Sequence, residues 1–280
     1  MEGGARGRAA RTTLTQDDTE LERPAMDGLY RPPTNPCTRC ELRTTTLLEG
    51  RCGPGDACLF VDSGRQIDRF LARNREWAEL SLHDPFWERR AIAAKWAPVE
   101  AIVSLIDDRD ETVRRSVASR LDGEPLARLA RDPDREVRVT VASRLPPPGL
   151  VQMMRDPDYA VRLQVARRLP HGRLPHMADD PDPVVRKEVA RRLPAFALGR
   201  MARDPDPEVR AIAASRMLPG DADRMLEDPE WTVRAAAIDQ ASPAALEHVR
   251  DHDPEPDVRL LAAERLATHS SSPTNHGSES

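Results

Sequence analysis

The sequence contains few aromatic residues and no long apolar stretch. Phe, Trp and Tyr together make up 4 % of the 280 residues, whereas prolines number 26. This balance suits a repeat protein with one proline-marked turn per unit better than a compact globule. No apolar run approaches the roughly 18 residues that a membrane span requires. The composition therefore favours a repeat protein and predicts no membrane partner.

The motifs of common enzyme classes are also missing. The sequence has no G-x-G-x-x-G fingerprint, no P-loop and no nucleophile elbow. Its seven histidines form no evident ligand set, and His248 and His252, although four residues apart, are expected at the surface. We therefore predict that the protein is not an enzyme.

The two ends of the chain differ in composition from the rest. Residues 1–26 contain no apolar stretch, so we expect a disordered leader rather than a secretory signal, with Met26 as an alternative start to Met1. Residues 267–280 are rich in Ser and are expected to form a disordered tail. Because no secretory signal is evident, we expect reduced thiols and a cytoplasmic protein.

The chain does contain a regular repeat. The pattern D-P-D-x-x-V-R-x-x-V-A-x-R-L recurs at a step of 24 residues, with one inserted residue before the last unit. Each unit begins at one of eight aspartates: Asp84, Asp108, Asp132, Asp156, Asp180, Asp204, Asp228 and Asp253. Stacked units bury one core between neighbours and expose long surfaces. We therefore predict an eight-unit solenoid over residues 84–266 that acts as a binding scaffold.

The residues of one unit indicate one long helix and one short helical piece. Asp132, followed by Pro, is expected to cap a helix. Val137, Val141 and Leu145 recur at four-residue steps and form one apolar helix face, which Pro146 ends. Only ten residues then remain before the next unit's Asp, too few for a second full helix. The predicted fold is therefore all-α.

An arginine follows the first Asp of every unit by six residues. The members of this row are Arg90, Arg114, Arg138, Arg162, Arg186, Arg210, Arg234 and Arg259. On a helical wheel this position falls inside the apolar arc, where a charge needs a partner. We predict that each Arg pairs with the Asp of its own or the next unit, which gives an Asp–Arg ladder.

A second arginine row, here called the arginine stripe, lies twelve residues after the first Asp of its unit. Its members are Arg120, Arg144, Arg168, Arg192 and Arg216. The wheel places them at the rim of the apolar face, with heads expected to reach solvent. Such a line could meet a protein partner or nucleic acid. Residues 84–266 carry 30 basic and 33 acidic side chains, which disfavours a dedicated nucleic-acid binder.

Four cysteines precede the repeats. Cys37, Cys40, Cys52 and Cys58 have the spacing C-x2-C-x11-C-x5-C, with Gly-Pro-Gly in the last gap. The glycines let this loop fold back, so we expect four converging thiolates. Four intracellular cysteines most often hold zinc, although zinc sites usually have two C-x2-C pairs. An iron–sulfur cluster tolerates irregular gaps. The spacing alone leaves zinc and the cluster open.

The combination of these two parts resembles the leucine-rich repeat variant family over residues 27–266. The carriers of the resemblance are the 24-residue unit with one long and one short helical piece, and the four cysteines before it. The resemblance implies a right-handed superhelix of alternating α- and 3-10 helices, a 4Fe-4S module over residues 27–61 held by Cys37, Cys40, Cys52 and Cys58, and an association with nitrogen-fixation gene clusters. Residues 62–83, with helical spacing of Ile67, Phe70, Leu71 and Trp77, are expected to form a joining helix.

The ends of the array depart from the repeat pattern. Arg89 stands where other units have Val, Arg109 where they have Pro, and Ala241 where they have Leu. Such differences are expected of terminal units. The sequence thus predicts a 4Fe-4S repeat protein that acts as a protein-interaction scaffold with a redox link. The alternatives are a zinc-stapled adaptor and a cluster-gated sensor whose solenoid binds nucleic acid.

Overall fold

The computed structural model of the chain describes residue 37 and residues 40–270. The expected leader, residues 1–26, lies outside the described residues. The expected tail begins inside a helix, because residues 267–270 belong to α15, and residues 271–280 lie outside the described residues. All regular elements of the described part are helices, with one isolated β-bridge between Gly53 and Ala57. The all-α prediction is confirmed.

Eight long helices repeat along the chain, one for each predicted unit. They are α3 (Trp87–Trp96), α5 (Glu111–Ala118), α7 (Arg135–Arg144), α9 (Tyr159–Arg168), α10 (Pro183–Arg192), α11 (Pro207–Ala214), α13 (Trp231–Ala237) and α15 (Pro256–Ser270).

Shorter pieces connect them. These are α4 (Val99–Ile102) with η3 (Val103–Leu105), α6 (Gly123–Arg128) with η4 (Leu129–Arg131), α8 (Pro147–Leu150) with η5 (Val151–Met153), η6 (His171–Met177), η7 (Ala195–Arg203), α12 (Pro219–Met225) and α14 (Pro243–His252). The pieces marked η are 3-10 helices, so the expected alternation holds through the middle of the array. The seventh unit, with its inserted residue, forms the full helix α14 instead.

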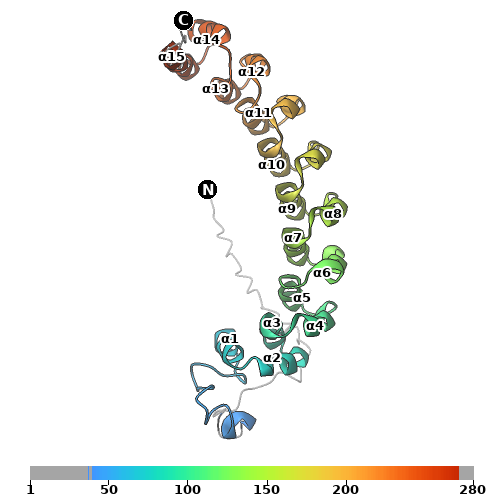
Figure 1. The fold of residues 1–280 in the computed structure, drawn as a ribbon. Coiled ribbons are helices and arrows are strands. Elements are labelled where there is room, and N and C mark those ends of the chain that lie inside the picture. Colours follow the sequence, from blue (N-terminus) through green and yellow to red (C-terminus); the bar gives the residue numbers. More distant parts are fainter. Residues whose placement is uncertain (1–36, 38–39, 271–280) are drawn as a thin grey trace, which may run out of the picture.

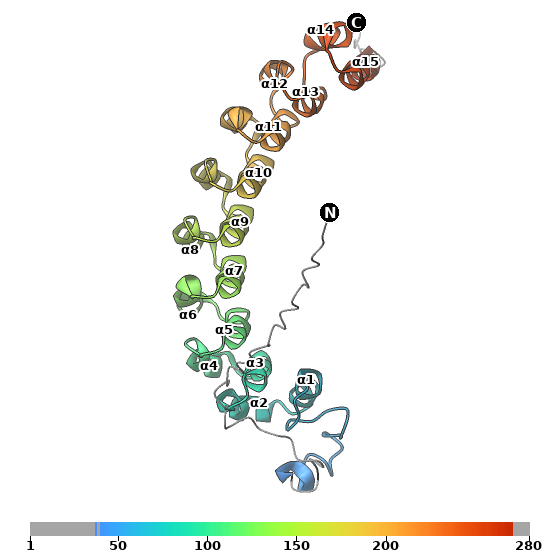
Figure 2. The same ribbon diagram turned by 180° about the vertical axis from the view of Figure 1, so that it is seen from behind.

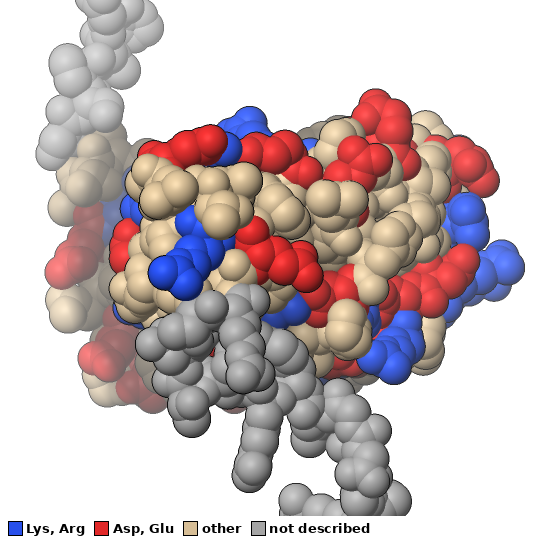
Figure 3. All heavy atoms as spheres, turned by 90° about the horizontal axis from the view of Figure 1, so that it is seen from below, with Lys and Arg blue, Asp and Glu red and all other residues tan. Residues whose placement is uncertain are grey.

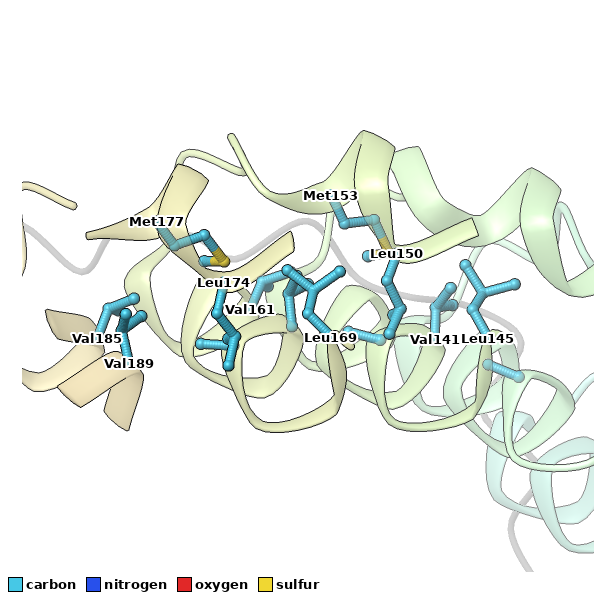
Figure 4. Close-up of a cluster of buried hydrophobic side chains, with 14 of the residues drawn as sticks. Val141, Leu145, Leu150, Met153, Val161, Leu169, Leu174, Met177, Val185 and Val189 are labelled. Carbon is cyan, nitrogen blue, oxygen red and sulfur yellow. The ribbon is translucent and has the colours of Figure 1, made fainter. Parts of the chain in front are cut away.

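The units stack side by side into an open arc. Figures 1 and 2 show the long helices along the concave side and the short pieces along the convex side. The two layers enclose a core of small and branched side chains, because Val, Leu and Met from both layers are almost fully buried between units. Figure 4 shows Leu150 and Met153 of one short layer on the same side of the core, facing Val161 of α9 and Leu169, the residue after that helix. Each unit therefore depends on its neighbours for burial.

The long helices begin two residues later than the sequence suggested. α7 is capped by Asp134, whose side chain accepts the backbone N–H groups of Glu136 and Val137 at 2.9 and 3.1 Å. The first Asp of that unit, Asp132, instead accepts the N–H of Asp134 at 2.9 Å. The prediction that Asp132 caps the helix was wrong. The side chain of Asp132 forms a turn with the backbone N–H of Asp134, and Asp134 then caps the helix.

The segment before the first unit is not the single joining helix that was expected. It contains α1 (Gly64–Arg73), α2 (Glu76–Leu80) and η2 (Ser81–His83). The break falls at Asn74, which is fully buried and donates to the carbonyl of Phe70 at 2.9 Å. Ile67, Phe70 and Leu71 of α1 are fully buried and belong to the same core as the array. None of the described helices is both long and apolar enough to cross a membrane.

Candidate metal centre and interaction surface

The cysteine loop is closed by tight backbone turns. Gly53 and Ala57 exchange both of their backbone hydrogen bonds at 2.9 Å, so the chain between Cys52 and Cys58 folds back on itself. Gly55 at its tip has φ +81°, a left-handed conformation that favours glycine. On the other side, the short helix η1 (Glu41–Thr44) follows Cys40. The close return predicted for the Gly-Pro-Gly loop is confirmed.

The four thiols influence one another electrostatically. Burial raises the pKa of the Cys52 thiol to about 11, with further contributions from the negative charge of Cys58, Cys40 and Cys37 and from a hydrogen bond with Cys58. Cys52 and Cys58 are buried, whereas Cys37 and Cys40 are half-buried, and the four form no disulfide. Without a cation, four thiolates in such a place would repel each other. The donor set therefore fits a soft, positively charged metal group.

Cys58 also receives two favourable contacts. Burial raises the pKa of the Cys58 thiol, while a hydrogen bond from the backbone N–H of Phe60 and the charge of Arg89 act in the opposite direction. No group of three or more His, Cys, Asp and Glu side chains in the described part of the chain is arranged as a site for one metal ion.

The loop is fastened to the helices that follow it. Asp56 at the loop tip pairs with Arg69 and Arg73 of α1. Arg51 donates to the side chain of Asn74 at 2.8 Å and pairs with Glu76 at the start of α2. These contacts hold the cysteine loop against α1 and α2.

Helix α1 is in turn fastened to the first unit. Asp68 of α1 accepts from Lys95 at 2.9 Å and from the indole N–H of Trp96 at 2.8 Å, both on α3. Leu42, Ala57 and Leu59 of the module are buried in the core that continues through the array. The cysteine module and the solenoid therefore share one hydrophobic core.

The Asp–Arg ladder is present as predicted, and the side-chain partner is the Asp of the next unit. Arg162 donates through Nε and Nη2 to the two carboxylate oxygens of Asp180 at 2.8 and 2.9 Å. Its Nη1 donates to the backbone carbonyl of Asp156, the first residue of its own unit, at 2.8 Å. Each ladder arginine thus ties its own turn to the next one.

The same two-pronged contact forms seven rungs within the described residues. They are Arg90–Asp108, Arg114–Asp132, Arg138–Asp156, Arg162–Asp180, Arg186–Asp204, Arg210–Asp228 and Arg234–Asp253. The last arginine of the row, Arg259, donates to the carbonyls of Asp253 and Pro254. At the other end, Asp84 pairs with Arg89 of its own unit.

The ladder should make the array sensitive to acid. Burial raises the pKa values of Asp108, Asp228 and Asp253, but the hydrogen bonds from their arginines and from a backbone N–H outweigh it and hold these values below the ordinary range. An unfolded Asp titrates near about 3.9. The stability that these carboxylates contribute is therefore fully present above about pH 5 and is lost as the pH falls through the folded pKa values.

Thermal unfolding followed by circular dichroism between pH 6 and pH 3 tests this expectation. Asp228→Asn removes one titrating carboxylate, so its melting temperature should fall less steeply with acid than that of the unchanged protein. Asp239→Asn, at an exposed position, is the matched control. Parallel curves for the Asp228 variant and the unchanged protein would show that the ladder carboxylates do not set the acid limit.

The arginine stripe contacts the preceding unit. Arg168 donates through Nη1 to the carbonyls of Ala142 and Leu145, at the end of α7, at 2.8 and 2.7 Å. Arg120, Arg192 and Arg216 make the equivalent contact. Arg144 contacts the carbonyl of Leu121 and the side chain of Asp122.

These arginines satisfy helix carbonyls that have no partner within their own helix. The helical wheel predicted that the guanidinium groups reach solvent, but they donate to carbonyls of the preceding unit instead. A wheel describes one helix and therefore does not include the acceptors of its neighbour. The role of the stripe as an interaction surface stays a prediction.

The face of the molecule seen from below carries both signs of charge (Figure 3). In the view from below, acidic and basic side chains lie interspersed rather than in one basic face (Figure 3). Arg167 and Arg191, next to the stripe, are exposed. His248 and His252 are exposed, as predicted, and their rings stack at 4.5 Å.

Comparison with known proteins connects both parts of the chain to one family. Residues 35–80 match the family description "LRV protein FeS4 cluster", and residues 135–158, 159–182 and 183–206 match "Leucine rich repeat variant". A solved structure described as "a leucine-rich repeat variant with a novel repetitive protein structural motif" has a TM-score of 0.79 and 54 % identity, covering 84 % of this chain and 100 % of its own.

A curated relative adds a genomic setting. A Rhodobacter capsulatus protein, described as "Uncharacterized 27.7 kDa protein in nifB 3' region", is 42 % identical over 86 residues. The aligned part spans 30 % of this chain and 34 % of that protein.

The fold and the cysteine module together define an iron–sulfur cluster-binding repeat protein. At 54 % identity over the whole of a solved leucine-rich repeat variant, the chain belongs to that family. Its N-terminal module is the 4Fe-4S cluster-binding module of the family. The predicted family and cofactor are confirmed.

Proposed function

We propose that Cys37, Cys40, Cys52 and Cys58 are the four ligands of the 4Fe-4S cluster. The observation that carries this assignment is the closed turn between Gly53 and Ala57, which folds the chain between Cys52 and Cys58 back on itself. All four lie within the 46 residues, 35–80, that match the cluster module. A bound cluster would supply one-electron redox chemistry. The protein's own contribution is to close the loop at Gly55 and to hold it against α1.

We further infer that the solenoid is an interaction scaffold for a protein partner. Stacked units offer a long continuous surface. The hollows between the units are lined by the ladder itself, for example by Asp108, Arg114 and Asp132, whose polar groups are already engaged. The near balance of 30 basic and 33 acidic side chains over residues 84–266 favours a protein over nucleic acid.

The relative encoded in the nifB 3' region supports a proposed role for this protein together with nitrogen-fixation proteins. Reduced thiols at the module favour the cytoplasm as its compartment. A redox link would arise if the partner touches the module end, where the cluster's charge changes with its redox state.

Metal analysis of the anaerobically purified protein tests the ligand assignment. We expect about four iron and four sulfide per chain, with broad absorption near roughly 400 nm that bleaches on reduction. Cys52→Ala should lose most of this iron, because its buried thiolate contributes one corner of the site. The double variant His248→Ala/His252→Ala removes an exposed, stacked histidine pair on α14, at the other end of the array, and is expected to keep the full iron content.

A colourless protein with one zinc per chain would contradict the 4Fe-4S assignment and favour the zinc-stapled adaptor. Full iron content in Cys52→Ala would remove Cys52 from the ligand set. For the scaffold, capture of a protein at low salt with no retention of random-sequence duplex DNA is expected. A steep salt dependence of DNA retention would instead favour the sensor that binds nucleic acid.

A further inference from the structure

The first unit carries a buried cation where every other unit carries valine. Five residues after the first Asp, the other seven units have a fully buried Val: Val113, Val137, Val161, Val185, Val209, Val233 and Val258. Arg89 occupies this position in the first unit and is 4 % exposed. A preceding unit would cover this helix face elsewhere in the array, but here the face meets the module. The substitution therefore lies where the solenoid adjoins the cysteine loop.

Arg89 is held between an acid and two aromatic rings. Its guanidinium pairs with the carboxylate of Asp84, the first Asp of the array. Its Cζ atom lies 5.8 Å from the ring centroid of Phe60 and 5.7 Å from that of Phe86. The other oxygen of Asp84 accepts the backbone N–H of Phe86 at 2.8 Å. Ring faces and a single carboxylate can compensate a buried guanidinium.

The same contacts lead directly to one of the four thiols. The backbone N–H of Phe60 donates to the sulfur of Cys58, and the ring of that Phe60 lies beside Arg89. The positive charge of Arg89 also acts on Cys58. Cys58 and Arg89 are both buried, at 4 % exposure each, and the ring of Phe60, two residues after Cys58, lies 5.8 Å from the Arg89 guanidinium carbon. Fixed charges and N–H donors near cluster sulfurs are among the features that set a reduction potential.

We propose that Arg89 sets the reduction potential of the cluster and that Asp84 opposes it. This inference rests on the proposed role of Cys58 as a ligand. A one-electron reductant adds one negative charge to the cluster and its ligands. A buried cation beside Cys58 stabilises the reduced form more than the oxidised form, whereas a buried carboxylate does the reverse. Asp84 is also the first Asp of the array. The Arg89–Asp84 ion pair therefore lies both beside the cysteine module and at the end of the Asp–Arg ladder.

The two residues therefore predict potential shifts of opposite sign. Arg89→Gln should lower the equilibrium constant for reduction by up to about tenfold, which is about 59 mV for a one-electron couple. Asp84→Asn should raise it, since an amide oxygen can still accept the Phe86 N–H while the negative charge is gone. Arg89→Lys keeps the charge and should stay near the unchanged protein. Arg114→Gln, at a half-buried ladder arginine one unit away, is the matched control and should leave the potential unchanged.

The experiment is a potentiometric titration of the full chain with dithionite, followed by electron paramagnetic resonance. Iron and sulfide are measured first in each variant, which separates a failed ligand assignment from a failed tuning role. If the unchanged protein and Arg89→Gln both contain the full iron content and have the same reduction potential, the inference is wrong. Where Arg89→Gln loses iron, Arg89→Lys and Asp84→Asn decide: a rise in Asp84→Asn supports the charge role, and no rise rejects it. A shift in Arg89→Lys equal to that in Arg89→Gln would assign the effect to packing instead of charge.

Discussion

Replacing Arg162 with Ala is expected to lower the free energy of unfolding by about 3–5 kcal/mol. The side chain is 8 % exposed and joins two units through four hydrogen bonds, two to the carboxylate of Asp180 and one each to the carbonyls of Asp156 and Pro157. Its removal leaves Asp180, itself 7 % exposed, as a buried charge without its cation. The cost of that uncompensated charge is the main part of the expected effect.

Chemical denaturation followed by circular dichroism measures this loss. Arg167→Ala on the same helix is the matched control, because Arg167 is exposed and its removal should cost less than about 1 kcal/mol. Equal unfolding midpoints for the two variants would refute a stabilising ladder. The shape of the transition carries further information. Units of a solenoid contact only their neighbours, so a weakened rung in the middle should broaden the transition or divide it into two steps.

The period of the sequence was sufficient to predict the array. Each unit needs an apolar helix face with fixed spacing. Val137 and Val141, four residues apart, lie on one such face whichever residue begins the helix. The helix start was predicted wrongly at Asp132, because Asp134 is of the same residue type and equally able to cap a helix. The choice of Asp134 depends on Arg114 of the previous unit, which engages Asp132.

Contacts between units set the limit of the sequence analysis. A wheel places Arg162 and Arg168 around one helix axis and indicates that the first needs a partner. It contains no information on the offset between neighbouring helices. The choice of Asp180 over Asp156 as the carboxylate partner, and of the α7 carbonyls as acceptors for Arg168, follows from that offset.

The cysteine module shows the same limit. The return of the loop between Cys52 and Cys58 could be predicted from its glycines, whereas the convergence of all four thiols on one site stays a prediction, since no three ligands in the described part of the chain are arranged around one metal ion. Attachment of the loop to α1 through Asp56 and Arg69 could not, because it depends on the break at Asn74 and on the direction in which α1 leaves the loop. Arg89 was visible as a departure from the repeat, but the sequence gives no sign that Phe60 lies beside it.

The arginine stripe is expected to stabilise the array as well as to line its surface. Changing Arg144, Arg168 and Arg192 together to Gln should lower the free energy of unfolding by about 3 kcal/mol in total, on the order of 1 kcal/mol for each lost set of charged hydrogen bonds. These three residues donate to carbonyls at the ends of the preceding units, and a shorter neutral side chain leaves those carbonyls to water. Thermal melting of the full chain measures the change.

The paired control is Arg167→Gln/Arg191→Gln, which neutralises two exposed arginines in the last turns of α9 and α10 and keeps the stripe arginines beside them. If the stripe region also binds a partner, this control should weaken capture at low salt while the melting temperature stays close to that of the unchanged protein, because exposed charges act over roughly 10 Å at 0.1 M salt. If the triple variant melts normally yet loses its partner, the carbonyl contacts contribute little and the stripe is an interaction surface alone. If both variants capture the partner normally, recognition belongs to the module or to the convex side of the arc, where the short helical pieces lie.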